Sequence, residues 1–325
     1  MVLDFGTSGI KVSQIGLGMA ALGRPGYINL GHNNDLNNNY DVEAMRQHSH
    51  AVLDVAYKSG IRYIDVAQSY GKGEAFLASW LESKGHNDVV VGSKWGYYYT
   101  AGWQVKTDVH EIKEHTLDRL NSQWADSKLT LGEDLKIYHI HSATFESGVL
   151  ENFSVLDRLE ELRAEGYIIG LSITATRQSE VLEKAMSIQI GGKPLFGSVQ
   201  GTFNCLEQSA RDALQQAHDN GLGVIIKEGM ANGRLSLRNE QAAYMEPLKS
   251  IATRHGVGVD AVALAYILHQ SFATVVLSGA ARADHLVSNL DALQVELSAD
   301  EVALLDSLAM KSEDYWGERS QMQWI

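Results

Sequence analysis

The sequence predicts a single α/β barrel of the (β/α)8 type, in one domain that spans residues 1–325. Eight short runs rich in Val and Ile recur along the chain, and amphipathic stretches lie between them. Most of the runs lack the alternation of a half-exposed sheet, which is typical of parallel strands covered on both faces. With only three prolines and no Pro- or Ser-rich linker, this repeated order favours one closed barrel over an open, doubly wound sheet.

The expected strands are short apolar runs that end near polar residues or glycine. They span residues 12–19, 62–67, 89–95, 135–142, 167–173, 196–204, 223–229 and 274–280. The amphipathic stretches between them carry apolar residues at three- and four-residue spacing, and several end in Gly, a common helix stop. The clearest of these helix-type stretches are 42–60, 73–85, 155–166 and 210–221.

Three segments fall outside the repeated units. The opening stretch, residues 3–13, is expected to form a small hairpin with Ser8 and Gly9 at its turn. The Asn-rich stretch 32–40 is expected to be a long solvated loop after the first strand, where it could line the barrel mouth. The chain beyond the eighth unit is expected to add an extra C-terminal helix and a tail.

Composition and charge narrow the classes of partner. The net charge is −13 and the pI is near 5.3, which argues against nucleic acid or an anionic membrane surface as the main partner. A single cysteine, Cys205, excludes an internal disulfide and fits a reducing compartment. No apolar run reaches the length of a signal peptide or a membrane span, so we expect a cytoplasmic protein that acts on a small molecule.

Ionisable side chains stand at the ends of successive expected strands. Asp65 lies in the second strand with Tyr70 just after it, and Lys94 lies near the end of the third. The fourth strand carries His139 and His141. In such barrels the chemistry is located at the C-terminal ends of the strands. A barrel built for packing alone does not need this set, which therefore predicts a catalytic site. Later strand ends are also polar, with Ser172, Thr174, Gln200, Asn204, Lys227 and Glu228.

Asp65, Tyr70, Lys94 and His141 would together form a proton donor. A buried carboxylate is costly unless it is paired, and Lys94 is the cation expected beside Asp65. The ammonium would lower the pKa of a neighbouring phenol from about 10, so that Tyr70 could donate a proton near neutral pH. His141 could hydrogen-bond a carbonyl oxygen held against the Tyr hydroxyl. The set suits reduction of a carbonyl by hydride, although the Asp65–Lys94 pair taken alone could equally be structural.

Several segments resemble the aldo-keto reductases in residues, order and spacing. They are YIDVAQSYG (63–71), VGSKWG (91–96), LKIYHIHSAT (135–144) and VVLSGAARADHLVSNLDAL (275–293), and the similarity covers nearly the whole chain. The resemblance implies a (β/α)8 barrel that binds NADPH in an extended form, with NADH as a second possibility. It also implies that Tyr70 is the general acid/base, that Lys94 and Asp65 tune it, and that His141 orients the carbonyl.

The resemblance is less complete where the nicotinamide would bind. Ser172 and Gln200 match residues that hold the carboxamide in the family. Ile173 stands where the family has Asn, which leaves Thr174 as a possible substitute. Lys227 replaces a Tyr that stacks on the nicotinamide ring in the family, so the ring is expected to be stacked by another residue or covered by the aliphatic stem of the lysine.

The segment after the eighth strand resembles the family's site for the adenosine 2′-phosphate. The matching residues are Gly279, Ala280, Arg282 and Asn289. Backbone N–H groups at the start of the following helix and the Arg282 guanidinium would form a local anion site in an acidic protein. This favours NADPH over NADH.

The function expected from these features is the reduction of a small aldehyde, ketone or sugar, and there are two alternatives to it. One is a barrel that binds NADPH as a sensor or regulatory subunit. The other is a metal-dependent hydrolase that uses His139 and His141, but the other strand ends supply no further His or Asp ligand, so no metal is expected. Aromatic residues at the mouth could wall the substrate pocket, with Tyr27, Trp95, Tyr97, Tyr98 and Trp316 as candidates.

Overall fold

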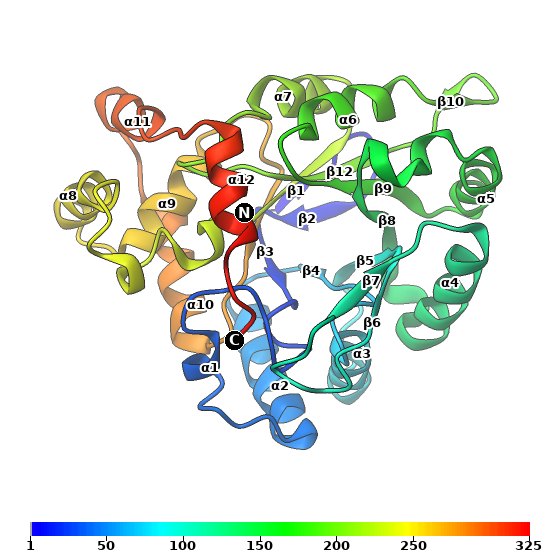
Figure 1. Cartoon of the computed structure of the whole chain (residues 1–325), viewed down its shortest axis with the longest axis horizontal. Helices are drawn as coiled ribbons and strands as arrows, with labels where there is room; N and C mark the ends of the chain where they lie inside the picture. Colours follow the sequence, from blue (N-terminus) through cyan, green and yellow to red (C-terminus); the bar gives the residue numbers. More distant parts are fainter. Residues whose placement is uncertain (1) are drawn as a thin grey trace.

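Eight parallel strands form a closed barrel in the computed structural model, which describes residues 2–325 (Figure 1). Around the barrel the strands follow one another in sequence order, so that chain neighbours are also neighbours in space. All eight expected strands are present, and the prediction of a (β/α)8 barrel is confirmed. Their bounds are Ile15–Gly18 (β3), Tyr63–Asp65 (β4), Val90–Trp95 (β5), Leu135–Ala143 (β8), Ile168–Ile173 (β9), Ser198–Thr202 (β12), Gly223–Lys227 (β13) and Val275–Ser278 (β14).

Helices surround the barrel, with at least one after each strand (Figure 1). In α2, Met45, Val52 and Ala56 are buried on one face, and Asp41 caps the first turn by accepting from the Ala44 N–H (2.8 Å). The helices are His32–Asp35 (α1), Val42–Lys58 (α2), Gly73–Lys84 (α3), Leu117–Leu131 (α4), Phe153–Ala164 (α5), Gln178–Met186 (α6), Arg211–Asp219 (α7), Met245–His255 (α8), Val259–Leu268 (α9), Ala283–Leu290 (α10), Ala299–Asp306 (α11) and Ser312–Ser320 (α12). Short 3-10 turns occur at Gly132–Asp134, Phe145–Ser147, Val149–Glu151, Ala231–Gly233, Leu237–Asn239 and Asp291–Gln294, and a small hairpin joins Gln189–Ile190 (β10) to Lys193–Pro194 (β11).

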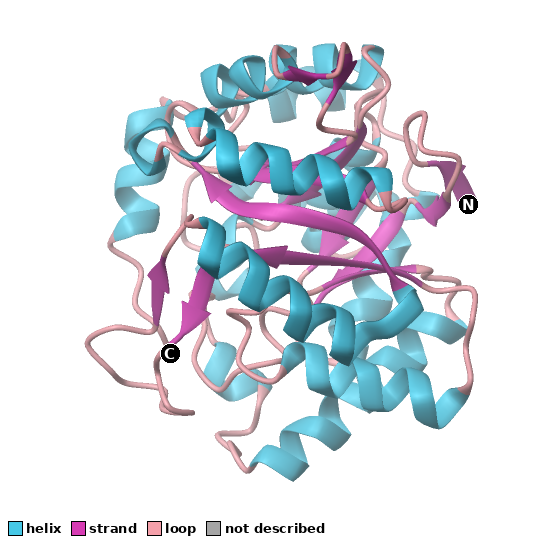
Figure 2. Ribbon diagram, turned by 90° about the vertical axis from the view of Figure 1, so that its right-hand side faces the viewer, coloured by secondary structure: helices cyan, strands magenta, loops and turns pink. Residues whose placement is uncertain are grey.

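The predicted N-terminal hairpin is confirmed, and it closes one end of the barrel. β1 (Val2–Asp4) pairs antiparallel with β2 (Lys11–Ser13). Phe5, in the turn between them, is completely buried, and its ring centroid lies 6.3 Å from that of Tyr63 inside the barrel. The hairpin therefore lies at the end opposite the strands' C-termini (Figure 2).

The mouth at the other end is covered by loops and by the end of the chain. β6 (Tyr97–Tyr99) and β7 (Glu111–Lys113) form a hairpin on the same side as the C-terminus (Figure 2). Tyr27 and Ile325 exchange two backbone hydrogen bonds of 3.1 and 3.2 Å, which join the C-terminal tail to the loop after β3. The predicted extra helix and tail are thus present, and the tail contributes to the mouth.

The barrel interior changes from apolar to polar along its axis. An apolar cluster fills the end closed by the hairpin and contains Phe5, Val12, Tyr63, Ile137, Ile225, Val275 and Leu277. Nearer the mouth, His139 and Ser198 are both buried and share a hydrogen bond of 2.7 Å. A second, larger apolar core lies between the strands and the helices and includes Cys205. The fold therefore concentrates interior polar groups beside the mouth.

The Asn-rich stretch 32–40 differs in part from the expected solvated loop. Its first residues form α1, in which His32 and Asp35 are buried. Asp35 turns inward because the guanidinium of Arg238 binds both of its carboxylate oxygens. Asn34 and the later asparagines, 37–39, are exposed as expected.

Within residues 2–325, no single helix is both long and apolar enough to cross a membrane. Met245–His255 and Val259–Leu268 meet that criterion only as a pair, and they are bent by 93° at the break between them. The second of these helices, α9, is buried on nearly all sides.

Candidate active site

The four residues of the predicted proton donor meet inside the barrel mouth. The Lys94 ammonium forms an ion pair with Asp65 and donates to the Val66 carbonyl at 3.0 Å. Its Nζ lies 3.4 Å from the Tyr70 hydroxyl oxygen. The rings of Tyr70 and His141 meet edge to face, with centroids 5.7 Å apart. The structure therefore brings the predicted set together.

Asp65 can lie in a barrel strand because both of its carboxylate oxygens accept hydrogen bonds. Gln200 Nε2 donates to Oδ2 at 2.7 Å, and the Tyr63 hydroxyl donates to the same oxygen at 3.2 Å. Lys94 binds the other oxygen. These partners replace water around a carboxylate that is only 2% exposed.

The pKa values of Tyr70 and His141 favour their neutral forms. Burial, with a contribution from the Asp65 charge, raises the pKa of Tyr70 well above 10. The expectation that Lys94 lowers this pKa is wrong, because the ammonium is paired with Asp65 and the pair has no net charge. Burial and the Lys94 charge hold the pKa of His141 well below 6.5. At neutral pH the phenol is therefore protonated and the imidazole uncharged.

The turn that carries Tyr70 fits against a glycine in the loop after β3. A Cβ on Gly23 would lie 2.3 Å from the Tyr70 carbonyl oxygen and 2.7 Å from the Cα of Gly73. The next residue, Arg24, donates to the Ser69 carbonyl at 3.1 Å. The position of Tyr70 thus depends on a close approach that only glycine permits.

Arg24 is a cavity residue that the sequence analysis missed. Its side chain is 3% exposed and forms an ion pair with Glu111 at 2.8 Å. Its guanidinium carbon lies 5.2, 5.1 and 4.6 Å from the ring centroids of Tyr27, Tyr70 and Trp324. A charged residue within the glycine- and alanine-rich stretch 16–26 was the available signal.

The aromatic wall differs from the expected one. Of the five aromatic candidates, Tyr27 lines the cavity, and Trp324, which was not a candidate, packs edge to face against it with ring centroids 6.4 Å apart. Trp95 is completely buried in the core outside the barrel. Tyr97 packs against His141 with ring centroids 5.0 Å apart.

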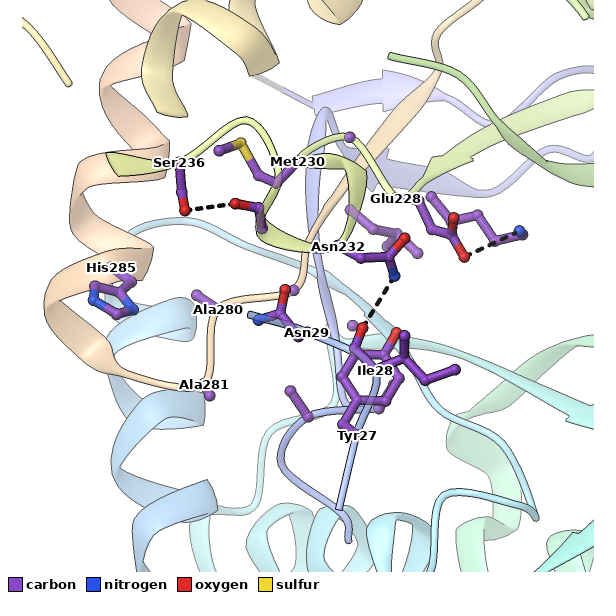
Figure 3. A pocket seen from close by; sticks show the side chains of 18 of the residues that line it. Tyr27, Ile28, Asn29, Glu228, Met230, Asn232, Ser236, Ala280, Ala281 and His285 are labelled. Atoms are coloured by element: carbon purple, nitrogen blue, oxygen red, sulfur yellow. Dashed lines mark hydrogen bonds and ion pairs between the residues drawn. The ribbon is translucent and has the colours of Figure 1, made fainter. Parts of the chain in front are cut away.

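A cavity of about 490 Å³ connects the Tyr70 region with the start of α10, and Figure 3 shows Tyr27, Met230 and His285 among the residues that line it. Its reactive end is lined by Asp65, Tyr70, His141, Thr174, Gln200 and Lys227. Its far end is lined by Gly279, Ala280, Ala281, His285, Ser288 and Asn289. Asp65, Tyr70 and His141 and most of the predicted cofactor residues therefore border one continuous space, and Lys94 lies completely buried behind them.

Ser172, one of the two residues expected to hold a carboxamide, has another partner. The Ser172 hydroxyl accepts the Ser142 N–H at 2.7 Å and does not border the cavity. Ile173 points outward and is completely buried in the apolar core between barrel and helices. Thr174 borders the cavity, which makes it the available polar side chain at this strand end.

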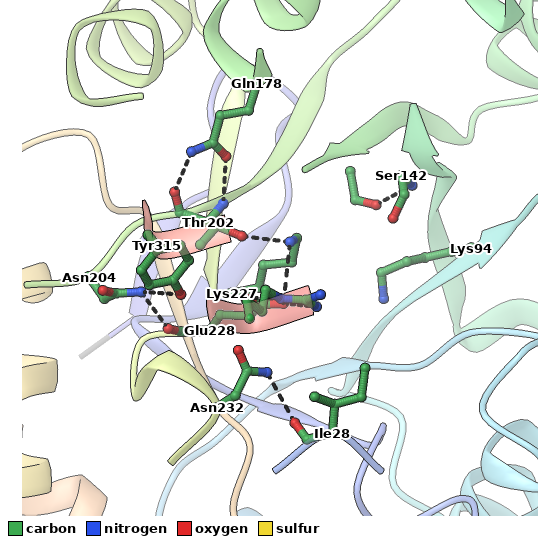
Figure 4. Close-up of polar contacts among 12 residues, drawn as sticks. Ile28, Lys94, Ser142, Gln178, Thr202, Asn204, Lys227, Glu228, Asn232 and Tyr315 are labelled. Carbon is green, nitrogen blue, oxygen red and sulfur yellow. Dashed lines mark hydrogen bonds and ion pairs between the residues drawn. The ribbon is translucent and has the colours of Figure 1, made fainter. Parts of the chain in front are cut away.

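Lys227 ends β13, Glu228 follows it, and both border the cavity. Figure 4 shows their polar contacts. The Lys227 ammonium donates to Thr202 Oγ1 at 2.7 Å, and burial lowers its pKa to about 8. Glu228 adopts a left-handed backbone conformation (φ 55°) and binds the guanidinium of Arg319 with both oxygens. Burial raises the pKa of Glu228, but Arg319 and Lys227 outweigh it and lower the pKa to about 2.

The segment after β14 places its predicted residues on two sides. Gly279, Ala280 and Asn289 border the cavity. Arg282 does not; its guanidinium binds both oxygens of Asp284 at 2.9 and 2.8 Å. The structure therefore keeps the predicted anion-binding arginine at the outer side of this helix start.

Arg238 and His285 supply positive or titratable groups inside the far end of the cavity. Arg238 is bound by Asp35, and His285 Nδ1 lies 3.8 Å from the same carboxylate. The sequence analysis missed Arg238 because it stands in an irregular loop more than 200 positions from its partner.

The metal-hydrolase alternative finds no supporting geometry. His139 is hydrogen-bonded to Ser198 and fills the barrel interior. Among residues 2–325, no group of three or more His, Cys, Asp or Glu side chains is placed to hold a metal ion.

Comparison with known proteins shows which family the chain resembles. The model of the aldo/keto reductase family matches residues 14–310. The aldo-keto reductase ausK of Emericella nidulans is 26% identical over 340 aligned residues, which cover 93% of this chain and 79% of that protein. An aryl-alcohol dehydrogenase [NADP(+)] of Phanerodontia chrysosporium is 23% identical over 336, covering 92% and 83%. The structure of aldo-keto reductase AKR11C1 from Bacillus halodurans, in its holo form, superposes with a TM-score of 0.70 at 21% identity, covering 95% and 96%.

Proposed function

The chain belongs to the aldo/keto reductase family, as an oxidoreductase of carbonyl and alcohol groups, and from this premise we propose how it works. In the proposal, Tyr70 is the general acid/base and NADPH is the cofactor, with NADH as the alternative. The observation that carries it is the meeting of Asp65, Lys94, Tyr70 and His141 at one end of a continuous cavity.

The lining of the cavity fits an extended dinucleotide, which when bound supplies a hydride to a carbonyl carbon. At the far end, a Cβ on Gly279 would meet nothing within 4 Å, so the backbone there is open to a ligand. Arg238 and His285 border that end and could bind phosphate. At the reactive end, Thr174 and Gln200 could bind the carboxamide. The NADP(+) in the name of one relative also supports NADPH.

Tyr70 would donate its proton to the carbonyl oxygen as negative charge develops there. The raised pKa keeps the hydroxyl protonated until that charge appears. The ammonium of Lys94, 3.4 Å away, would then stabilise the phenolate left behind. His141, neutral because of its lowered pKa, would orient the same oxygen by a hydrogen bond without competing as an acid.

The proposed substrate is a small aldehyde, ketone or sugar. Next to Tyr70 the cavity is bordered by the Arg24–Glu111 ion pair and by the rings of Tyr27 and Trp324. This mixture supports a small carbonyl compound that carries hydroxyl groups or a flat ring. An aryl-alcohol dehydrogenase among the relatives supports the second type.

Tyr70→Phe tests the proposal. It should reduce kcat by about 10²- to 10⁴-fold with a panel of short aldoses and aromatic aldehydes, with unchanged Kd for NADPH. Tyr57→Phe, on the protein surface, is the matched control and should keep wild-type kcat. Wild-type turnover by Tyr70→Phe would refute the role of Tyr70. Binding of NADPH by the wild type with no turnover of any carbonyl would favour the sensor alternative.

A further inference from the structure

Lys227 is a second lysine at the reactive end of the cavity, and the proposed mechanism gives it no role. It borders the cavity together with Tyr70 and Gln200, and its side chain is 17% exposed. Figure 4 shows its ammonium beside the neutral Thr202 hydroxyl at 2.7 Å and the Glu228 carboxylate at 3.9 Å. A largely buried cation whose nearer partner is neutral needs a reason to be retained at this position.

Taken together, Lys227 and the charged groups around it carry one net positive charge. Asp65 is paired with Lys94. Two nitrogens of the Arg319 guanidinium donate to Glu228. The Oε1 atom of Glu228 lies 2.5 Å from the guanidinium and 3.9 Å from the Lys227 ammonium. Because each of these two pairs has no net charge, Lys227 adds one positive charge to this part of the cavity.

We propose that Lys227 makes the cavity discriminate between the oxidation states of a nicotinamide cofactor, so that the reduced form binds more tightly than the oxidised form. The inference rests on the proposed use of such a cofactor. A nicotinamide ring is positively charged when oxidised and neutral when reduced. A ring that serves a carbonyl held by Tyr70 and His141 must lie in the stretch of cavity that Lys227 also borders. The ammonium there repels the oxidised ring and not the reduced one.

This preference suits a reductase. Tighter binding of the reduced cofactor loads the site for carbonyl reduction, and weaker binding of the oxidised cofactor speeds its release after each turnover. The adenosine and phosphate groups are common to both forms, so their contacts do not affect the ratio of the two affinities.

The test compares the Kd of NADP⁺ with the Kd of NADPH, measured by quenching of tryptophan fluorescence. The ratio measured is the Kd of NADP⁺ divided by the Kd of NADPH. In the wild type and in Lys227→Arg, which keeps the charge, this ratio should be greater than one. In Lys227→Met it should be on the order of tenfold smaller. The Kd of 2′-phospho-ADP-ribose, which lacks the nicotinamide, should be the same in all three proteins and shows that each is folded.

The pH dependence gives a second readout. Burial lowers the pKa of Lys227 to about 8, so the wild-type ratio should decline between about pH 7 and pH 9.5 as the ammonium loses its proton. Lys227→Arg should keep its ratio over that range, and Lys227→Met should stay low throughout. Equal ratios in wild type and Lys227→Met would overturn the inference while leaving cofactor use intact. Failure of the wild type to bind either cofactor would overturn the proposed function itself.

Discussion

Arg319 holds Glu228 with two nitrogens, at distances of 2.5 to 3.0 Å, and so joins the loop after β13 to the C-terminal helix α12. A second link lies beside it, because Asn204 donates to the Tyr315 hydroxyl at 3.0 Å. The same Asn204 amide donates to the backbone carbonyl of Glu228 at 2.9 Å. The left-handed conformation of Glu228 is thus fixed by contacts from both directions, and the end of the chain helps to shape the cavity wall.

Glu228→Gln should loosen this connection. The depressed pKa, from 4.5 to about 2, corresponds to about 3 kcal/mol of unfolding free energy in the wild type above pH 4.5. Since the folded-state pKa is lowered, this stabilisation is present at neutral pH and is lost as the pH falls from about 4.5 towards 2.

Urea unfolding at pH 7 should show a lower free energy of unfolding in Glu228→Gln than in the wild type. Amide hydrogen exchange in residues 312–325 should be faster in the variant. Glu318→Gln, which breaks the more exposed pair with Arg234, is the control and should cost less than about 1 kcal/mol. Unchanged exchange in Glu228→Gln would contradict the assigned connection.

Lys94→Met should destabilise the protein as well as inactivate it. The change leaves the Asp65 carboxylate buried without its counter-ion, which typically costs about 3–5 kcal/mol. Lys94→Met combined with Asp65→Asn removes both charges and should recover part of that loss, although turnover stays abolished. Chemical denaturation of the two variants measures the difference. A double variant no more stable than the single one would show that the pair is not the main reason Asp65 is tolerated.

Arg238→Ala should weaken NADPH binding more than Arg282→Ala. Arg238 borders the cavity, whereas Arg282 lies outside its lining and is bound by Asp284. Loss of a charged hydrogen bond to a phosphate costs on the order of 2 kcal/mol, so the Kd for NADPH should rise roughly tenfold or more in Arg238→Ala. Titration of both variants with NADPH and NADH measures the effect and shows whether it depends on the 2′-phosphate. A larger effect of Arg282→Ala would support the assignment made from the sequence motif.

The core of the candidate site could be predicted because it depends on strand order alone. Asp65, Lys94 and His141 belong to three consecutive parallel strands, and such strands are adjacent in a barrel with their ends at one mouth. Alternation along a strand also accounts for Ile173, since it must point away from the barrel interior if Ser172 points into it.

The remaining parts of the site depend on contacts that no local pattern specifies. Arg24 meets Trp324 although 300 positions separate them, and neither belongs to a helix or strand. Arg238 lies in a 3-10 turn, and its pairing with Asp35 follows from how two loops pack over the mouth. The pairing of Arg282 with Asp284, two positions later, could not be read from the motif, which suggests only a ligand for the guanidinium.

The backbone bonds between Tyr27 and Ile325 bear on how the protein can be labelled. Residues fused after Ile325 would begin at the rim of the cavity, next to Trp324 and Arg24, where they could block entry or pull the tail away. The N-terminal hairpin lies at the opposite end of the barrel (Figure 2). An affinity tag or fluorophore attached at the N-terminus therefore leaves the mouth unobstructed, whereas the same tag at the C-terminus is expected to disturb ligand access.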